Sequence, residues 1–254
     1  MKPIIIIAAV PQETGLLEKS LTDSIRVKSG GFECVEGTIG NLSVVVCAGG
    51  VGKVNAAAAT AVMIDRYQPQ LVVNTGCAGA YTGSGLVVGN LVVASEEVLA
   101  DDGVVVADGW KDLHHMKLPS VEQDGLSCYN ILPLSGHASE MAIQLADSCG
   151  VSLVRCRFAT VSTCSGTEQY GAEMAGRWNA LAESMEGAAV AQVCLRCGVD
   201  CLEIRGISNM VEERDLKKWD IPRAVEAAQC FVLKYLEEMD KPNLSPIQKA
   251  TQKA

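Results

Sequence analysis

The sequence predicts a single α/β domain in which a central mixed, mainly parallel twisted sheet lies between two layers of helices. Three observations lead to this prediction. Short apolar runs alternate with helical patterns along the chain, and these runs are continuously apolar, as in strands that are buried on both faces. No repeat or linker divides residues 1–240, and 254 residues with 48 % apolar content suffice for one large core.

The expected strands are rich in Ile and Val, whereas the expected helices carry apolar residues at three- and four-residue spacing. Residues 100–133 combine turn signals with little periodicity and indicate a long loop or insertion. Residues 241–254 are polar with two prolines, so we expect a disordered tail after the catalytic domain of residues 1–240. The expected strands are 4–9, 42–48, 71–74, 89–95, 152–163 and 201–208, and the expected helices are 16–20, 53–67, 137–148, 168–181, 185–197 and 221–239.

Composition excludes several classes of protein. A net charge of −9 and a pI near 4.9 argue against non-specific nucleic-acid binding, which depends on Lys and Arg. No run of 18 uncharged apolar residues predicts a membrane span, and the apolar run near the N-terminus is too short for a signal peptide. Eleven cysteines are scattered through apolar segments, as expected of reduced thiols in a cytoplasmic protein. The C-x-x-C of Cys194 and Cys197 has no second pair, so we interpret it as core packing.

Two loops of small residues follow expected strands. The first, AGGVGKVNAA at 48–57, has Asn55 in place of the third glycine of a dinucleotide-binding loop. It also lacks the Ser or Thr that follows the lysine of a nucleotide P-loop, because Val54 follows Lys53. What remains is a set of backbone N–H groups at a helix start that can hold a water or an oxygen-bearing ligand. The second loop, NTGCAGA at 74–80, permits a ligand to approach the backbone closely.

Three polar residues are expected to meet at one edge of the sheet. Glu186 is the single charge between Met185 and Leu195, on a helix that is otherwise apolar and therefore buried. It either caps its own helix or binds hydroxyl groups of a ligand. Glu13 and Asn209 each lie where an expected strand ends, and ligands bind at the carboxyl edge of a parallel sheet.

Five stretches carry a resemblance to a known family. AAVPQETGLL, GGVGKVNAA, VNTGCAGA, SMEGAAVAQV and RGISN occur in that order between residue 4 and about residue 239. Together they resemble the purine nucleoside phosphorylase/nucleosidase superfamily, and within it the branch of methylthioadenosine/S-adenosylhomocysteine nucleosidases. The stretches TVSTCSGT, ESMEGAAVAQVCLR and EIRGISNMVEERDLKKW are similar to those of futalosine hydrolases. These enzymes of an alternative menaquinone pathway cleave the N-glycosidic bond of futalosine with water, giving hypoxanthine and dehypoxanthine futalosine.

The resemblance implies a nucleoside phosphorylase/hydrolase-like fold and a role for individual residues. Glu13 matches the general base for the attacking water, and Glu186 matches the carboxylate that binds the ribose hydroxyls. Asn209 matches the position where adenine-specific nucleosidases carry the aspartate that protonates N7. Relatives usually carry Ser where this chain has Cys77. The resemblance further implies a purine nucleoside substrate, a homodimer, no metal and no cofactor. The residues expected to contact substrate are Cys77, Ala78, Gly79, Gly166, Thr167, Met185 and Arg205.

Two departures from the family pattern bear on the reaction. Superfamily phosphorylases carry a phosphate-binding arginine where this chain has Asn74, so we expect water as the nucleophile. Asn209 has an amide that donates to O6 or N7 of a 6-oxopurine and has no proton to deliver at neutral pH. Both departures favour a hydrolase of 6-oxopurine nucleosides.

Several alternatives stay open at this point. A methylthioadenosine/S-adenosylhomocysteine-type nucleosidase or a purine nucleoside phosphorylase has the same fold, and so has a catalytically silent nucleoside-binding protein. A metal-dependent hydrolase requires ligands such as Asp101, Asp102, His114 and His115, but their spacing is not that of a metal site.

Overall fold

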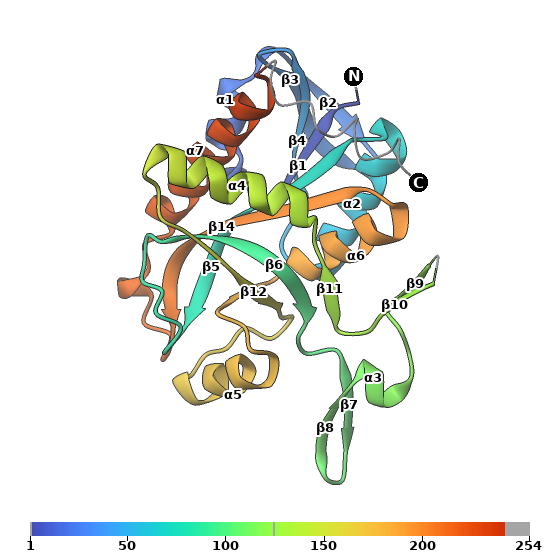
Figure 1. The fold of residues 1–254 in the computed structure, drawn as a ribbon, viewed down its shortest axis with the longest axis vertical. Helices are drawn as coiled ribbons and strands as arrows, with labels where there is room; N and C mark the ends of the chain where they lie inside the picture. The colour runs from blue at the N-terminus through green and yellow to red at the C-terminus, as the bar shows by residue number, and fades with distance from the viewer. Residues whose placement is uncertain (1, 124, 242–254) are drawn as a thin grey trace.

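The computed structural model describes residues 2–123 and 125–241, and ten strands of this part form one mixed sheet (Figure 1). The predicted single α/β unit with a mixed sheet is therefore confirmed. The strands of this sheet are β1 (Ile4–Ala8), β2 (Thr22–Ser29), β3 (Phe32–Ile39), β4 (Leu42–Ala48), β5 (Leu71–Tyr81), β6 (Leu91–Leu99), β11 (Ile131–Pro133), β12 (Leu153–Thr160), β13 (Ala182–Ser184) and β14 (Asp200–Val211).

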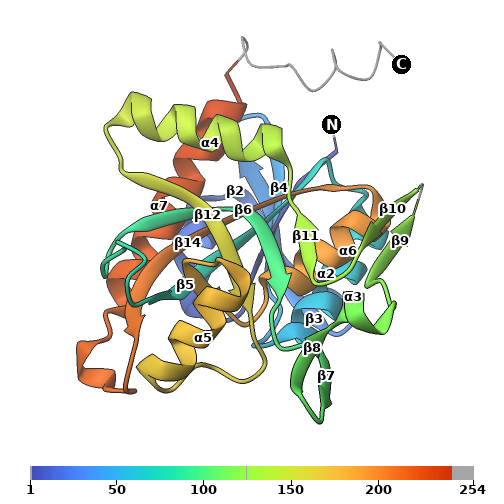
Figure 2. The ribbon, with the colours of Figure 1, turned by 60° about the horizontal axis from the view of Figure 1, so that its bottom comes forward.

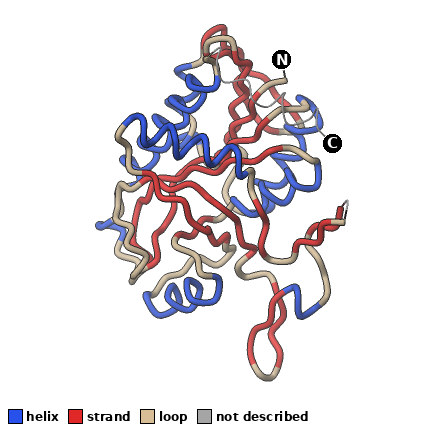
Figure 3. Tube along the Cα trace, in the orientation of Figure 1, coloured by secondary structure: helices blue, strands red, loops and turns tan. Residues whose placement is uncertain are grey.

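Helices cover both faces of the sheet (Figure 3). Strand β1 shows why: Ile4 and Ile6 pack into one apolar cluster, and Ile5 and Ile7 pack into another. Because successive side chains of a strand point to opposite faces, a run of four isoleucines requires an apolar layer on each side. The helices are α1 (Gly15–Ser20), α2 (Lys53–Tyr67), α3 (Leu113–Met116), α4 (Gly136–Cys149), α5 (Glu168–Trp178), α6 (Gly187–Cys197) and α7 (Ile221–Met239), with short 3-10 turns η1 (Pro11–Glu13) and η2 (Leu216–Lys218).

The first apolar cluster includes side chains of α1, α4 and α7, and the second includes side chains of α2 and α6. Figures 1 and 2 show these two groups of helices on either side of the strands. A fully buried Ile or Leu contributes about 1.5–3 kcal/mol relative to an exposed one, so these two clusters are the main source of stability.

The sheet is less parallel than the sequence predicts. Half of the ten pairings within the described part of the sheet are antiparallel. Strands β5, β14, β6, β12 and β13 pair in a closed, barrel-like ring, because β13 joins β12 to the end of β5. The long strands β5 and β14 make this closure possible, since strand twist accumulates with length. The simple three-layer prediction is wrong in this respect.

One segment differs from the sequence-based expectation, and a second lies almost wholly outside the described residues. Residues 100–133 contain two small hairpins, β7 (Gly103–Val106) with β8 (Gly109–Asp112) and β9 (Val121–Gln123) with β10 (Leu126–Cys128), as well as α3 and β11. Figure 1 shows the β7–β8 hairpin extending from the body of the molecule. The predicted tail, apart from residue 241, lies outside the described residues. Among the helices of the described part, none is long and apolar enough to cross a membrane.

Gly206 tests the packing of α7 on the sheet. A methyl group at this position of β14 would overlap the backbone of Ala224 in α7. We expect Gly206→Ala to lower the free energy of unfolding by about 1–3 kcal/mol, because backbone has to move to relieve such overpacking. Gly176→Ala is the matched control: the position is exposed on α5 with open space around it, and a gain of about 0.5–1 kcal/mol is expected there. Urea unfolding followed by circular dichroism measures both changes, and equal stability of the two variants would contradict the packing argument.

Candidate active site

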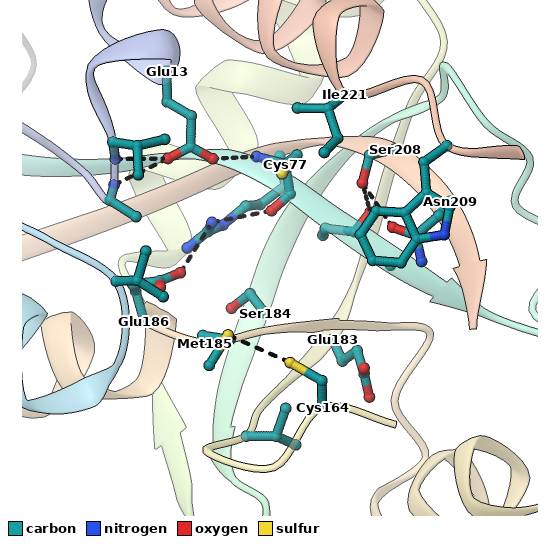
Figure 4. Close-up of a pocket in the computed structure, with 18 of the residues that line it drawn as sticks. Glu13, Cys77, Cys164, Glu183, Ser184, Met185, Glu186, Ser208, Asn209 and Ile221 are labelled. Atoms are coloured by element: carbon teal, nitrogen blue, oxygen red, sulfur yellow. Dashed lines mark hydrogen bonds and ion pairs between the residues drawn. The ribbon is translucent and has the colours of Figure 1, made fainter. Parts of the chain in front are cut away.

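A cavity of about 470 Å³ opens where β1, β5, β13 and β14 end. Its walls come from η1, the small-residue end of β5, the loop after β12, the turn before α6 and the segment from β14 to α7. This volume is in the range of small-molecule sites. Figure 4 shows Glu13, Cys77 and Glu186 at one end of the cavity and Asn209 and Glu183 at the other.

Glu13 lies in the short turn that follows β1, and its carboxylate is buried. Oε2 accepts hydrogen bonds from the backbone N–H groups of Ala9 (3.0 Å) and Val10 (3.3 Å). Oε1 accepts one from the N–H of Cys77 (3.0 Å). Gly76 makes room for this carboxylate, because a Cβ there would lie 2.7 Å from Glu13 Cδ. Backbone donors thus hold the charge of Glu13 beside the small-residue loop of β5.

Glu186 stands at the N-cap of α6, one residue before the helix and not within its first turn as predicted. It makes no side-chain capping bond, so the predicted alternative of a self-capping residue is wrong. Oε1 instead accepts the N–H of Gly52 (2.9 Å), at the start of α2. This N–H, expected to face a ligand, therefore fixes a carboxylate that in turn borders the cavity.

Arg205 links Glu186 to a second buried carboxylate, Glu203. Its guanidinium is buried; Nη1 donates to Glu186 Oε2 (3.5 Å) and to the Cys77 carbonyl (3.1 Å), and Nε donates to Glu203 Oε1 (2.8 Å). Burial alone would lower the pKa of Arg205, but the surrounding carboxylates outweigh it and raise this pKa. Sequence reasoning missed Glu203. The signal was its i, i+2 spacing to Arg205, which puts both side chains on one face of β14.

Cys77 lines the cavity beside Glu13, with Ala78 and Gly79. Burial and then the neighbouring Glu13 charge raise the pKa of the Cys77 thiol to about 11. The thiol is therefore neutral near pH 7 and is a poor nucleophile. Met185 lines the wall between the two ends, where its sulfur accepts a contact from the Cys164 thiol (3.4 Å).

Asn209 lies inside β14 and not after its end as predicted, since the strand continues to Val211. A register shift makes Ser208 an extra residue between Ile207 and Asn209, and such bulges re-aim neighbouring side chains. Asn209 Oδ1 accepts from Ser208 Oγ (2.8 Å), and Nδ2 donates to the Met210 carbonyl (3.1 Å). Because a carbonyl only accepts, the atom next to it is the amide nitrogen, which keeps one further N–H for a ligand.

Glu183 is a cavity residue that sequence reasoning missed. Its two oxygens accept from the N–H (3.0 Å) and the hydroxyl (2.7 Å) of Ser165, and burial raises the pKa of its carboxyl. The three-residue strand β13 is too short to give a periodic signal. Cys164 and Ser165 line the cavity, whereas Gly166 and Thr167 are not among its lining residues.

Other described residues complete the picture of this region. Thr167 caps α5 by accepting from the N–H of Tyr170 (3.2 Å). Arg214 and Trp219 follow β14 at the cavity wall, with the guanidinium 5.0 Å from the ring centroid. Neither residue was singled out from the sequence, because both lie in a polar segment without periodicity.

The residues considered for a metal site are used differently. Lys53 donates to Asp101 (2.6 Å) and also to Asp102, and His114 packs edge-on against Tyr129. Across residues 2–123 and 125–241, no group of three or more His, Cys, Asp or Glu side chains is arranged to hold a metal ion. The geometry gives no support to a metal-dependent hydrolase.

Comparison with known proteins identifies the family. Residues 3–237 match the phosphorylase superfamily. A 5'-methylthioadenosine/S-adenosylhomocysteine nucleosidase of an Exiguobacterium species is 30 % identical over 209 residues, which cover 82 % of this chain and 85 % of the relative. The nucleosidase of Colwellia psychrerythraea, solved in complex with adenine, superimposes with a TM-score of 0.80 at 28 % identity, covering 93 % of this chain and 95 % of the other.

The chain belongs to the phosphorylase superfamily. Its relatives are nucleosidases, and the prediction of an enzyme of this N-glycosyl hydrolase class is confirmed. The native futalosine hydrolase of Helicobacter pylori superimposes with a TM-score of 0.81 over 93 % of this chain and 98 % of its own, at 24 % identity. At that identity the likeness concerns the fold alone.

Glu13→Gln tests the carboxylate at this end of the cavity. We expect the turnover number to fall by about 10²–10⁴-fold if Glu13 is the general base, because an amide takes no proton from water. We also expect a cost of about 1–3 kcal/mol in stability, because one amide oxygen replaces two acceptors that hold three backbone N–H groups. Initial rates and thermal unfolding measure the two effects. Glu18→Gln on α1 is the control, and a rate near wild type for Glu13→Gln would rule out the assigned role.

Proposed function

We propose that the enzyme hydrolyses the N-glycosidic bond of a 6-oxopurine nucleoside and that its substrate is futalosine, cleaved to hypoxanthine and dehypoxanthine futalosine in menaquinone biosynthesis. The observation that carries the proposal is Asn209, an amide donor at the end of the cavity opposite Glu13 and Glu186. Three further features support it: the position of Glu183, the charges around Arg205, and the resemblance of three sequence stretches to futalosine hydrolases.

The Asn209 amide selects for the leaving base. The Ser208 hydroxyl lies within hydrogen-bond distance of Oδ1 and of the Ala78 carbonyl and donates to one of them. Nδ2 donates one N–H to the Met210 carbonyl, so its second N–H is a donor for a ligand. Hypoxanthine presents two acceptors at this edge, O6 and N7, whereas adenine presents the N6 donor beside N7. A donor at this position stabilises negative charge that develops on the leaving hypoxanthine, and it opposes the amino group of adenine.

Glu183 supplies the complementary acceptor. Gly79 pairs with Glu183 on one side and with Asn209 on the other, which places the two Cα atoms about 9.5 Å apart, at two strand spacings. Both side chains lie next to the space that a side chain at position 79 would fill, since a Cβ on Gly79 would lie 3.1 Å from Asn209 Nδ2 and 3.7 Å from Glu183 Cγ. A 6-oxopurine carries a hydrogen on N1 that a carboxylate accepts, whereas N1 of adenine is itself an acceptor. A base lying over Gly79 therefore meets a donor and an acceptor that match hypoxanthine.

The charges at the other end favour water over phosphate as the nucleophile. Arg205 is the guanidinium nearest to Glu13, and it already carries ion pairs to Glu186 (3.5 Å) and Glu203 (2.8 Å). Only Nη2 of Arg205 has no partner, and it is buried. The charge of Arg205 is already offset by two carboxylates, so a phosphate dianion at this end would meet buried negative charge with little net positive charge to balance it. Asn74, at the position of the phosphorylase arginine, is buried in β5. A neutral water molecule meets no such penalty.

The roles at this end follow from the same contacts. Glu13 takes a proton from the attacking water, with its carboxylate oriented by three backbone donors. Glu186, fixed by Gly52 and Arg205, accepts hydrogen bonds from the ribose hydroxyls, and its negative charge stabilises an oxocarbenium-like transition state. Met185 packs against the sugar between the two ends.

The specific substrate rests on sequence resemblance. The stretches at 160–167, 183–196 and 203–219 resemble futalosine hydrolases, and they contribute Glu183, Asn209 and Trp219 to the cavity. The second candidate is a methylthioadenosine/S-adenosylhomocysteine nucleosidase, which is favoured by the 30 % identical Exiguobacterium relative. Asn209 favours the first candidate, because the second activity requires a donor of a full proton to N7 of adenine.

A panel of substrates tests the proposal. We expect the enzyme to release hypoxanthine from futalosine, and more slowly from inosine, at rates that inorganic phosphate does not change. Methylthioadenosine is expected to be cleaved about 100-fold more slowly or worse, given about 1–3 kcal/mol for each mismatched polar contact. Free base is measured by chromatography. Release that depends on phosphate would overturn hydrolysis, and comparable release of adenine would overturn the 6-oxopurine assignment.

Asn209→Asp directly tests whether the Asn209 amide selects the leaving base. An aspartic acid gives a proton to N7 and accepts from the amino group of adenine, so the ratio of kcat/KM for methylthioadenosine to that for inosine is expected to rise by about 100-fold or more. The variant is nearly isosteric, and Ser208 still donates to the oxygen that it contacts now. Ser162→Ala, outside the cavity lining, is the control. An unchanged ratio would show that Asn209 does not select the base.

A further inference from the structure

The interior of the molecule contains a second acidic pair that the roles above do not use. Glu97 of β6 and Glu203 of β14 are completely buried. Glu97 Oε2 accepts from Thr160 Oγ1 (2.7 Å) and from the N–H of Val98 (3.2 Å). Glu203 Oε1 accepts from Arg205 Nε (2.8 Å). Within the described part of the chain, Glu97 Oε1 and Glu203 Oε2 have no such donor.

These two oxygens point to the same place. A methyl group on Gly187, the first residue of α6, would overlap both Glu97 Oε1 and Glu203 Oε2. Two ionised carboxylates in contact without a donor between them are strongly unfavourable in a buried site. One proton between the two oxygens removes a charge and supplies the missing hydrogen bond, as in other carboxylate pairs that share a site.

We propose that Glu97 and Glu203 share one proton and act together as a positioning pair for Arg205. The proton resides on Glu97, whose Oε1 donates to Glu203, and Glu203 keeps the negative charge that holds Arg205 Nε. The guanidinium is thereby oriented so that Nη1 reaches Glu186 and the Cys77 carbonyl. The pair acts through Arg205 and touches no substrate, and its role is independent of which base the enzyme releases.

The location of the proton follows from the surroundings of each carboxyl. Arg205 lies against Glu203 and stabilises its ionised form, whereas Glu97 has only the neutral donors Thr160 and Val98. Burial, and then the charge of Glu203, raise the pKa of Glu97 well above its usual range. The Thr160 hydroxyl that donates to Glu97 itself accepts a hydrogen bond from the N–H of Ala188 in α6 (2.7 Å).

The other titratable groups facing the pair stay neutral near pH 7. Burial raises the pKa of the Cys156 thiol to about 12 and raises that of the Tyr81 phenol still further. A hydrogen bond with Cys194 of α6, together with burial, raises the pKa of Cys201 well above its usual range. Arg205 of β14 is the charged side chain in contact with the pair, through its ion pair to Glu203. Glu186, at the start of α6, contacts this guanidinium. The proton of the pair is therefore the one expected to titrate.

Glutamine substitutions test the shared proton, because a single amide can imitate it. In Glu97→Gln the amide NH₂ donates to Glu203, and in Glu203→Gln it donates to Glu97 while its oxygen accepts from Arg205. Each single variant keeps one negative charge, and the double variant keeps none. We expect kcat/KM to fall by about threefold in Glu97→Gln, about tenfold in Glu203→Gln and well over 100-fold in the double variant, a strong departure from additivity.

Stability against pH gives a readout that packing alone does not move. An unfolded glutamate titrates near pH 4.3, so above that pH the wild-type native state holds one proton that the unfolded state lacks. The stability of the wild type then falls as pH rises. Between pH 5.5 and 7.5, this proton is expected to raise the unfolding equilibrium constant of the wild type by about tenfold per pH unit. Neither single variant holds the proton, so neither is expected to show this additional pH dependence. Urea unfolding at several pH values measures this difference.

The assay uses the purine nucleoside that the wild-type enzyme cleaves fastest, so a wrong choice of base does not affect it. Glu96→Gln, on the neighbouring residue that pairs with Arg157, is the matched control and should leave kcat/KM unchanged. Additive rate effects, or equal pH slopes in wild type and single variants, would overturn the shared proton. If Glu203→Gln does not fold, Glu97→Leu replaces it: this variant has no donor for Glu203, and a rate equal to that of Glu97→Gln would equally overturn the proposal.

Discussion

The buried guanidinium of Arg205 is the constraint on which the rest of the site depends. It is the one cation within reach of Glu186 and Glu203 in the described structure, and it also donates to the carbonyl of Cys77. Burying one charge without partners is very costly, so each of these groups requires the others. This requirement ties β14 to β5 and to the start of α6. The arrangement of the Glu186 end of the cavity therefore depends on charge compensation as much as on shape.

The two ends of the cavity use different physical means. At the end that contains Glu13 and Glu186, the carboxylates are held by backbone N–H donors and by Arg205. At the opposite end, Asn209 and Glu183 are contacted by the hydroxyl groups of Ser208 and Ser165. The contacts of Asn209 join neutral groups and are therefore individually weaker than the hydrogen bonds of the carboxylates at the other end.

Sequence patterns were sufficient for the elements with strong periodicity and for residues that follow them. Helices 53–67 and 221–239 have the predicted bounds. Glu13, Glu186 and Asn209 line one cavity, as their expected positions at strand ends and at a helix start indicated. The ring closure by β13 was beyond prediction, because a three-residue strand pairs through long-range geometry and not through local propensity. For the same reason Glu183 was not found. The bulge at Ser208 leaves no signal in composition, so Asn209 was placed outside the strand.

The bond from the Gly52 N–H to Glu186 links a backbone amide at the start of α2 to a carboxylate that borders the cavity. Any ligand hydroxyl that donates to Glu186 would withdraw electron density from this carboxylate and weaken its hold on the Gly52 amide. The chemical shift and the exchange rate of the Gly52 amide proton should therefore report occupancy of the Glu186 end of the cavity, although Gly52 itself does not line it. The Gly52 amide signal should therefore distinguish ligands that place a hydroxyl group on Glu186 from ligands that do not.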